Sequence, residues 1–425
     1  MSTLPQLSPA ELTARRDQLT ARYQDFQARN LTLDMTRGKP CPEQLDLSMA
    51  LLEGPGRDYL AEGNIDCRNY GGLEGIPEAR RLFAAYLEVR PDEIMVGDSS
   101  SLKMMHDTIL GAMVHGTAPD APAWGKLPKV KFLCPSPGYD RHFAVCQYLG
   151  IEMIAVAMDE SGPDMDRVEE LAAADEAIKG IWCVPKYSNP TGITYSDRVV
   201  ERLAAMRTAA ADFRIFCDNA YAVHDLTGQP DRLKNVLAAC REAGNPERVL
   251  LFGSTSKITL AGAGIAMLAA SRRNLDFIRG KMENQTIGPN KLNQLNHVRF
   301  LKDLDGIAAH MRKHAAILKP KFDVVLDTLK RDLGRAGIAT WSNPRGGYFV
   351  NIDTLEGCAR AVVSMAAQAG VKLTPAGATF PYGQDPLDRN IRIAPSYPSV
   401  DELATAMELV TICIQLAGID KLLEG

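Results

Sequence analysis

From about Gly56 onward, amphipathic stretches of the chain alternate with short apolar and β-branched runs. The amphipathic stretches have helical periodicity and predict helices at Pro77–Leu87, Ser101–Met113, Asp197–Ala210 and Pro230–Ala243. The short runs predict buried strands at Glu93–Val96, Val130–Cys134, Met153–Ala157, Gly180–Val184, Arg214–Cys217 and Val249–Phe252. Because apolar strands that alternate with helices form mostly parallel sheets covered on both faces, this region predicts a three-layer α/β domain.

The pattern changes near Leu301, where a long helical periodicity begins and runs to about Leu333, with a break or kink expected at Pro320. Short strands follow at Ala339–Trp341, Tyr348–Ile352, Val371–Leu373 and Ile391–Ile393, together with further helices. Near the N-terminus, Ser8 and Glu11 form a capping box that predicts an amphipathic covering helix. We therefore expect a large α/β domain at residues 56–315 and a smaller α+β domain made of residues 1–55 and 316–425.

The composition is that of a globular protein, with 46% hydrophobic and 24% charged residues among 425. The formal net charge of −4 creates no field that would attract nucleic acid or anionic lipid. The nine cysteines form no CxxC pair, so we expect small core residues rather than disulfides or a thiolate metal site. The sequence shows no signal-peptide pattern, and its longest uncharged apolar run, Leu260–Ala270, is too short to span a bilayer. We expect a cytoplasmic protein without a nucleic-acid or membrane partner.

Polar residues follow several of the predicted strands, at the edge where parallel sheets collect their ligands. Asp218 and Lys257 end neighbouring strands and are 39 residues apart, which leaves room for one crossover helix. Burying a lysine is costly unless its charge is paired or removed. A Schiff base between Lys257 and an aldehyde cofactor would remove the charge, and Asp218 would then keep a pyridine nitrogen protonated.

A second polar segment, Asp98–Lys103, lies between a predicted strand and a predicted helix. Its successive backbone N–H groups, its hydroxyls and the positive end of the helix form a potential anion site.

Together these motifs resemble the fold-type I pyridoxal-phosphate enzymes, the aspartate aminotransferase superfamily, over roughly Thr36 to Pro398. The matching motifs are Asn189-Pro190-Thr191-Gly192, Asp218-x-x-Tyr221 and Ser254-x-Ser256-Lys257. The likeness is to an atypical branch of aspartate aminotransferases, related to the effector domains of MocR-type regulators. It implies a three-layer large domain with a smaller α+β domain, and pyridoxal 5′-phosphate as the cofactor.

The resemblance also implies a role for each residue. Lys257 would form the Schiff base and move the proton, Asp218 would pair with the ring nitrogen, and Asn189 and Tyr221 would bond the ring oxygen. Tyr139 would stack on the ring, and His142 would stand behind the aspartate. The phosphate would be held by hydroxyls on two loops: Ser99, Ser100, Ser101, Ser254 and Ser256.

Three further residues are implied to act outside the cofactor ring. Arg392 would clamp the α-carboxylate of the substrate, a task that suits the bidentate geometry of guanidinium. Gly38 would lie in a loop over the substrate. Tyr70 would reach the phosphate of a neighbouring subunit, so the resemblance implies a homodimer with shared active sites.

The sequence departs from the family pattern at two places. The phosphate-binding arginine expected eight residues after Lys257 is replaced by Ile265, which leaves Ser256, Lys103 or backbone donors to meet the charge. No arginine occurs in the Glu283–Pro289 segment, where dicarboxylate-specific members place a cation. The cations that could substitute are Arg37, Lys39, Arg141 and Lys291.

The function expected from these residues is a ping-pong aminotransferase acting on an L-amino acid and a 2-oxo acid, with aspartate or glutamate as the best guess for the donor. A β-lyase or a decarboxylase could use the same site, and a non-catalytic sensor domain is a further alternative. His310 and His314 are helically spaced but lack the glutamate of a zinc-protease motif, so we expect a solvated helix face and no metal.

Overall fold

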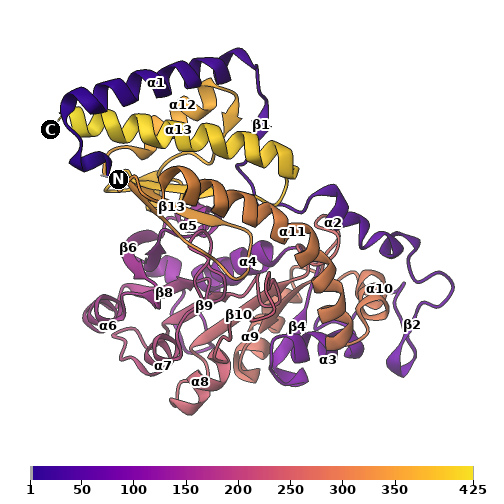
Figure 1. Cartoon of the computed structure of the whole chain (residues 1–425). Helices are drawn as coiled ribbons and strands as arrows, with labels where there is room; N and C mark the ends of the chain where they lie inside the picture. Colours follow the sequence, from indigo (N-terminus) through magenta and orange to yellow (C-terminus); the bar gives the residue numbers. More distant parts are fainter. Residues whose placement is uncertain (1–2, 425) are drawn as a thin grey trace.

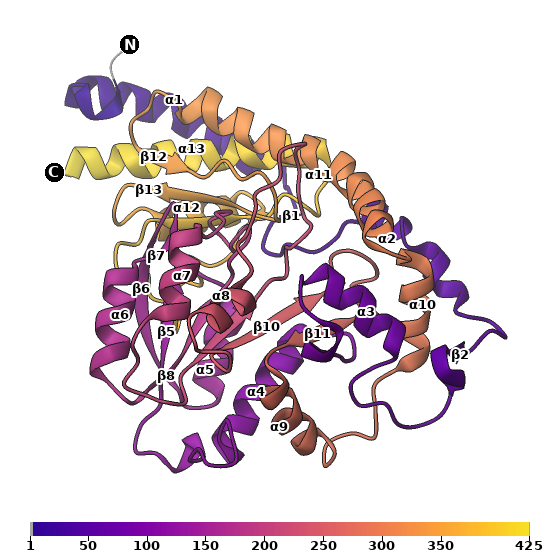
Figure 2. The same ribbon diagram turned by 90° about the horizontal axis from the view of Figure 1, so that it is seen from below.

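The computed structural model describes residues 3–424, and its centre is an eight-stranded sheet in the order β4-β11-β10-β9-β8-β5-β6-β7 (Figures 1 and 2). In that order the strands are Ile94–Val96, Ala266–Ala269, Val249–Ser254, Arg214–Asp218, Ile178–Cys183, Lys131–Ser136, Glu152–Asp159 and Gly162–Pro163. Strands β10, β9, β8, β5 and β6 are paired in parallel. Strand β4 runs the same way, because both β4 and β10 are antiparallel to β11. The carboxyl ends of these strands therefore share one edge, and the predicted α/β class is confirmed.

Helices cover both faces of this sheet, each over its own apolar core. The helices of one face are α3 (Pro77–Tyr86), α6 (Met165–Ala174), α7 (Asp197–Ala205), α8 (Val236–Glu242) and α10 (Lys291–Leu301). The helices of the other face are α4 (Ser101–His115), α5 (Asp140–Tyr148) and α9 (Arg272–Met282). Successive strand residues alternate between the two cores, as Phe132 and Leu133 do in β5. The nine cysteines are all buried and unpaired, as predicted.

The smaller part of the chain has a third core, under an antiparallel sheet and several helices. Its sheet contains β12 (Ala339–Trp341), β13 (Val350–Thr354) and β15 (Asn390–Ile393), and β1 (Leu33–Asp34) pairs in parallel with β14 (Val371–Lys372). Its helices are α1 (Pro9–Ala28), α12 (Ala359–Gln368) and α13 (Val400–Glu424), which lie together in Figure 1. Helix α13 is long and apolar enough to cross a membrane, but 78% of its apolar window is buried among the other elements. It is a core helix.

Helix α11 (Leu304–Leu333) connects the two parts. Its first turns, at Ile307 and Met311, belong to a core of the large sheet, and its second half, from Leu318 onward, belongs to the third core. The helix continues through Pro320, so of the break or kink expected there the break is wrong. Packing on both sides of the proline outweighs the hydrogen bond that the proline removes.

Two further short pieces pack on these helices. Helix α2 (Pro42–Asp46) lies beside α11. The hairpin of β2 (Leu60–Ala61) and β3 (Ile65–Asp66) lies beside α3 and α10, where Arg81 pairs with Glu62 and Arg299 donates to the Leu60 carbonyl (Figure 2).

Candidate active site

A cavity of about 280 Å³ lies at the edge where the parallel strands end. Its lining contains most of the predicted cofactor residues, which come from five loops: Ser99, Ser100, Ser101, Tyr139, Asn189, Asp218, Tyr221, Ser254, Ser256 and Lys257. The loops follow β4, β5, β8, β9 and β10, and the common direction of these strands is the reason that the loops meet.

Asp218 ends β9 and is almost completely buried. Its Oδ2 accepts a hydrogen bond from His142 Nε2 at 3.1 Å, and the imidazole of His142 stacks on Trp182 with ring centroids 4.1 Å apart. Its Oδ1 is buried and has no hydrogen-bond partner among the described residues. An unpartnered buried carboxylate oxygen is costly, so this atom requires a donor from a molecule in the cavity.

Lys257 follows β10 and lies close to two aromatic rings. Its Nζ is 5.1 Å from the ring centroid of Tyr221 and 5.9 Å from that of Tyr348. Burial lowers the pKa of the amine, while the charge of Asp218 acts in the opposite direction. A lowered pKa increases the fraction of neutral amine, which is the form that attacks an aldehyde.

Asn189, Tyr221 and Tyr139 form the side walls of the cavity. Asn189 Oδ1 accepts from Arg392 Nη1 at 3.2 Å, which leaves the amide N–H groups of Asn189 as donors. Burial raises the pKa of the Tyr221 hydroxyl, so this group stays protonated and can donate. Burial also raises the pKa of Tyr139 to about 12, and its ring meets His142 edge-on at 4.9 Å.

Serine residues of two loops also line the cavity. Ser100 caps α4 by accepting a hydrogen bond from the backbone N–H of Lys103, and the first, positive turn of α4 lines the cavity with Ser101. Ser254 Oγ and Ser256 Oγ are 2.8 Å apart, and Ser256 donates to the Ser99 carbonyl. The arrangement is a potential anion cradle of hydroxyl and backbone donors.

The position of the missing arginine and the two side chains considered as its replacement have different surroundings. Ile265 is fully buried in the apolar core, with its backbone N–H bonded to Thr255 Oγ1, so this position supplies no charge to the cavity. The ammonium of Lys103 pairs with Asp107 on the next turn of α4. Ser256 lies at the cavity as proposed.

Arg392 on β15 reaches the same site from the smaller part of the chain. Its side chain is 6% exposed, and Nη1 donates to Asp140 Oδ1 at 2.9 Å and to Asn189 Oδ1. Its Nε is buried without a partner among the described residues. Nη2 makes two longer contacts, to the Thr36 carbonyl at 3.4 Å and to Thr374 Oγ1 at 3.3 Å, so a carboxylate ligand would replace weak contacts of the guanidinium.

Gly38 lies in the loop next to Arg392, whose Nη2 contacts the Thr36 carbonyl at 3.4 Å. A Cβ atom at Gly38 would stand 2.5 Å from Phe349 Cζ, which is closer than real contacts allow. Only glycine therefore lets this loop pack so closely on β13 and the edge of the site.

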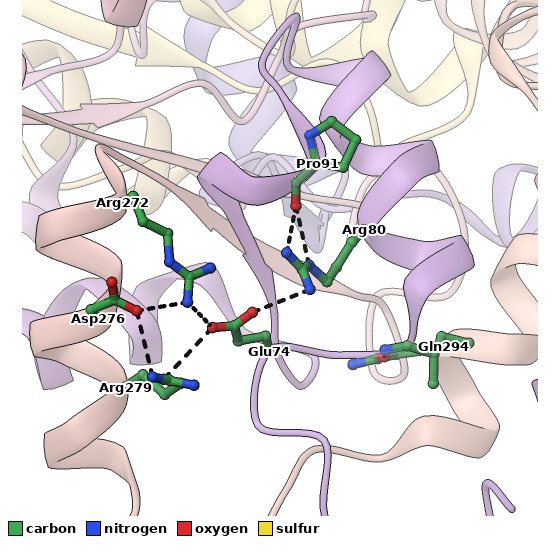
Figure 3. A network of polar contacts seen from close by, with 8 residues as sticks. Glu74, Arg80, Pro91, Arg272, Asp276, Arg279 and Gln294 are labelled. Carbon is green, nitrogen blue, oxygen red and sulfur yellow. Dashed lines mark hydrogen bonds and ion pairs between the residues drawn. The ribbon is translucent and has the colours of Figure 1, made fainter. Parts of the chain in front are cut away.

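Tyr70 does not line the cavity of its own chain, and it is 81% exposed. Its loop is nevertheless anchored on both sides: Lys291 Nζ donates to the carbonyls of Asn69 and Gly71, and Glu74 accepts from arginines of α3 and α9 (Figure 3). Lys291 is thus occupied by backbone carbonyls rather than free for a substrate.

The interpretation of His310 and His314 as a solvated helix face is wrong. Both are buried, at 6% and 1% exposure, and they contact the loop that carries Lys257. Their i, i+4 spacing showed that they share a face of α11, but only the fold shows that this face turns inward. Gln44, His224 and Asp140 are further site neighbours that the sequence did not indicate.

The comparisons with known proteins agree with this geometry. The profile of the family described as aspartate amino-transferase matches residues 7–425. An aspartate aminotransferase of Corynebacterium glutamicum is 46% identical over 403 residues, which is 95% of this chain and 93% of the relative. A crystal structure of an aspartate transaminase from the same species superposes with a TM-score of 0.97 at 44% identity and covers 99% of both chains. The alpha-aminoadipate aminotransferase of Thermus thermophilus, solved with N-(5′-phosphopyridoxyl)-L-leucine, shares the fold at a TM-score of 0.75 and 22% identity, covering 95% of this chain and 98% of that one.

Proposed function

This chain belongs to the aspartate amino-transferase family and is an aminotransferase, and from that premise we propose that it uses pyridoxal 5′-phosphate in the cavity between Asp218, Lys257 and α4. The single observation that carries the proposal is the buried Asp218 Oδ1, which has no hydrogen-bond partner among residues 3–424 and could accept from a protonated ring nitrogen. The serine residues and the end of α4 suit a phosphate, and the amine of Lys257 suits an aldehyde.

When bound, the coenzyme supplies an aldehyde carbon that amines attack and a pyridinium ring that withdraws electrons from the substrate. The chain's own residues orient the reacting atoms. Asp218, held by His142, keeps the ring nitrogen protonated. Asn189 and Tyr221 donate to the ring oxygen, and Tyr139 covers a ring face. Lys257 Nζ would be the group that accepts the proton of the substrate Cα and donates it again.

Arg392 binds the α-carboxylate of the amino acid through its fork of N–H donors. Together with Gly38 and Asn189, Arg392 would place the Cα–H bond of the substrate against Lys257. Closure of the smaller domain (1–55 and 316–425) on the larger one (56–315) would exclude water from the site. Aspartate or glutamate, with 2-oxoglutarate as the acceptor, are the proposed substrates. The side-chain carboxylate would be met by Arg37, Lys39 or Arg141, which are all exposed near the Arg392 loops.

The proposed assembly is a cytoplasmic homodimer in which Tyr70 completes the phosphate site of the partner subunit. An exposed tyrosine on a loop anchored by Lys291 and Glu74 suits this task, because the loop needs no reordering when the subunits meet.

The test is a spectral half-reaction of the purified holoenzyme with a panel of L-amino acids. We expect the absorbance of the lysine-bound coenzyme to shift to that of the amine form with acidic amino acids, and Lys257→Ala to abolish turnover. Full turnover by Lys257→Ala would refute the proposal. Release of ammonia and pyruvate, or of carbon dioxide, without a 2-oxo acid would instead identify a β-lyase or a decarboxylase.

A further inference from the structure

Three buried histidines surround the backbone that carries Lys257, and the reaction as proposed uses none of them. His224 Nε2 lies 3.3 Å from the Lys257 carbonyl oxygen, and His310 Nε2 lies 2.7 Å from that of Ile258. His314 Nε2 is 3.1 Å from His310 Nε2, so His314 is connected to the Ile258 carbonyl through the ring of His310. All three side chains are at most 6% exposed.

The hydrogen bonds determine where the protons of these rings lie. Gln44 Oε1 accepts from the backbone N–H of Cys41, so Gln44 Nε2 is the atom that donates to His314 Nδ1 at 2.9 Å. His314 Nδ1 is therefore an acceptor, and the ring proton of the neutral imidazole is on Nε2. A carbonyl oxygen only accepts, so His224 carries its proton on Nε2 and donates to the carbonyl of Lys257. The Nε2 atoms of His310 and His314 lie together at the carbonyl of Ile258.

The three rings are neutral, so their contacts do not change with protonation near neutral pH. We call the set of Gln44, His224, His310 and His314 the clamp, because its contacts hold the backbone at Lys257. Burial lowers the pKa of His224 to about 3 and that of His314 to about 4, and it also lowers the pKa of His310. The charged groups that face them, Lys257 and Lys186 beside His224, are cations that act in the same direction.

The clamp also connects two parts of the chain that the reaction needs to coordinate. Gln44 lies in α2, six residues after Gly38, and its Nε2 also donates to Tyr348 Oη at 2.9 Å. Tyr348 comes directly before Phe349, whose ring contacts Gly38. The hydroxyl of Tyr348 is 3.5 Å from the carbonyl oxygen of Lys257. Buried polar contacts therefore run from the segment over the substrate to the backbone of the lysine.

We propose that Gln44, His224, His310 and His314 are positioning residues that hold the Lys257 backbone for proton transfer and tie it to the Gly38 segment. The proposal rests on the proposed function for the identity of the reaction, but the clamp itself is a property of the folded chain. Loss of a donor lets the backbone at Lys257 and Ile258 move, and Nζ moves with it relative to the substrate Cα–H bond.

The test compares His314→Leu, which removes the donor, with His314→Gln, whose amide restores an N–H near the position of Nε2. A displacement of about 1 Å costs about 100-fold in rate, so we expect His314→Leu to slow the amino-acid half-reaction about 10- to 100-fold. The dissociation constant of the amino acid should stay unchanged, and the isotope effect with Cα-deuterated substrate should rise. His314→Gln should recover most of the rate.

A second readout needs no coenzyme. Hydrogen exchange of the coenzyme-free protein should accelerate at the amides of residues 255–260 in His314→Leu and stay near wild type in His314→Gln. Leu318→Ala is the matched control, because Leu318 is similarly buried one turn further along α11 and belongs to the apolar core, and its side chain has no hydrogen-bonding group. Should His314→Leu not fold, Gln44→Met removes the amide donor at nearly constant volume.

The proposal is overturned if Leu318→Ala, at the same loss of stability, reproduces the rate loss and the isotope effect, or if exchange at residues 255–260 does not change. It is also overturned if His314→Gln is as slow as His314→Leu. Failure of the proposed function is a different result: the wild-type holoenzyme would then transfer no amine from any amino acid, whatever the exchange data show.

Discussion

Replacing Arg392 by glutamine removes the group proposed to bind the α-carboxylate. The loss can be estimated from the contacts of its side chain. A hydrogen bond to a charged group contributes about 1.5–3 kcal/mol, so the two bonds of a guanidinium fork to a carboxylate are worth about 3–6 kcal/mol. At about 1.4 kcal/mol per factor of ten, kcat/KM for the amino acid should fall about 10²- to 10⁴-fold.

Arg392→Lys provides a graded comparison. It keeps the positive charge opposite Asp140 and Asn189 but replaces the planar fork by a single ammonium, so the loss should be smaller, about 10- to 100-fold. The assay is the half-reaction rate as a function of amino-acid concentration. A primary amine without a carboxylate is the control substrate and should react equally, although slowly, with all three proteins. A kcat/KM for Arg392→Gln within about threefold of wild type would refute the assignment, as would an equal loss with the control amine.

Three other expectations concern the coenzyme site, the assembly and the buried histidines. Asp218→Asn removes the charge that holds the ring nitrogen protonated and should lower kcat about 100- to 1000-fold. The absorbance of the coenzyme would show that it is still bound. An unchanged kcat would contradict the role of Asp218. Mixed dimers of Lys257→Ala and Tyr70→Ala subunits should regain activity that neither parent has. One of their two sites combines Lys257 of one subunit with Tyr70 of the other and is therefore complete. If activity is not recovered, the sites are not shared. His224 and His314 stay neutral in the fold but protonate near pH 6.5 when unfolded, so their stability contribution is complete above pH 6.5. It decreases by about 1.4 kcal/mol per pH unit for each group, down to about pH 4 for His314 and about pH 3 for His224. Urea unfolding at pH 7.5 and pH 5 should show this loss, and His314→Gln should show less of it; an equal loss in both proteins would argue against it.

The sequence was most informative where the chemistry and the strand ends coincide. Asp218, Asn189 and Lys257 each follow an apolar run, and parallel strands must bring such loops together, so their meeting in one cavity could be foreseen. The antiparallel direction of β11 could not be foreseen, because Ala266–Ala269 lies within a uniformly apolar run that does not indicate the direction of a strand. Local pattern identifies buried segments better than it identifies their neighbours.

The misjudged residues have a common cause. His310 and His314 are polar and separated by one helical turn, which is also how a solvated face looks. Their burial depends on Gln44 and on the Ile258 carbonyl, partners that are far away in sequence and that the periodicity of α11 cannot reveal. Pro320 is a similar case, since its cost within the helix is local but the packing that outweighs it is not.

Helix α11 also has a mechanical consequence. Thirty residues at about 1.5 Å each make a rod roughly 45 Å long, with one end embedded in each of two cores. If its first turn acts as a fulcrum, a tilt of about five degrees there shifts the far end by roughly 4 Å. The rod would then act as a lever, and the imidazoles of His310 and His314 lie close to the fulcrum, where displacement is smallest and the geometry around the reactive amine is best preserved while the far end swings.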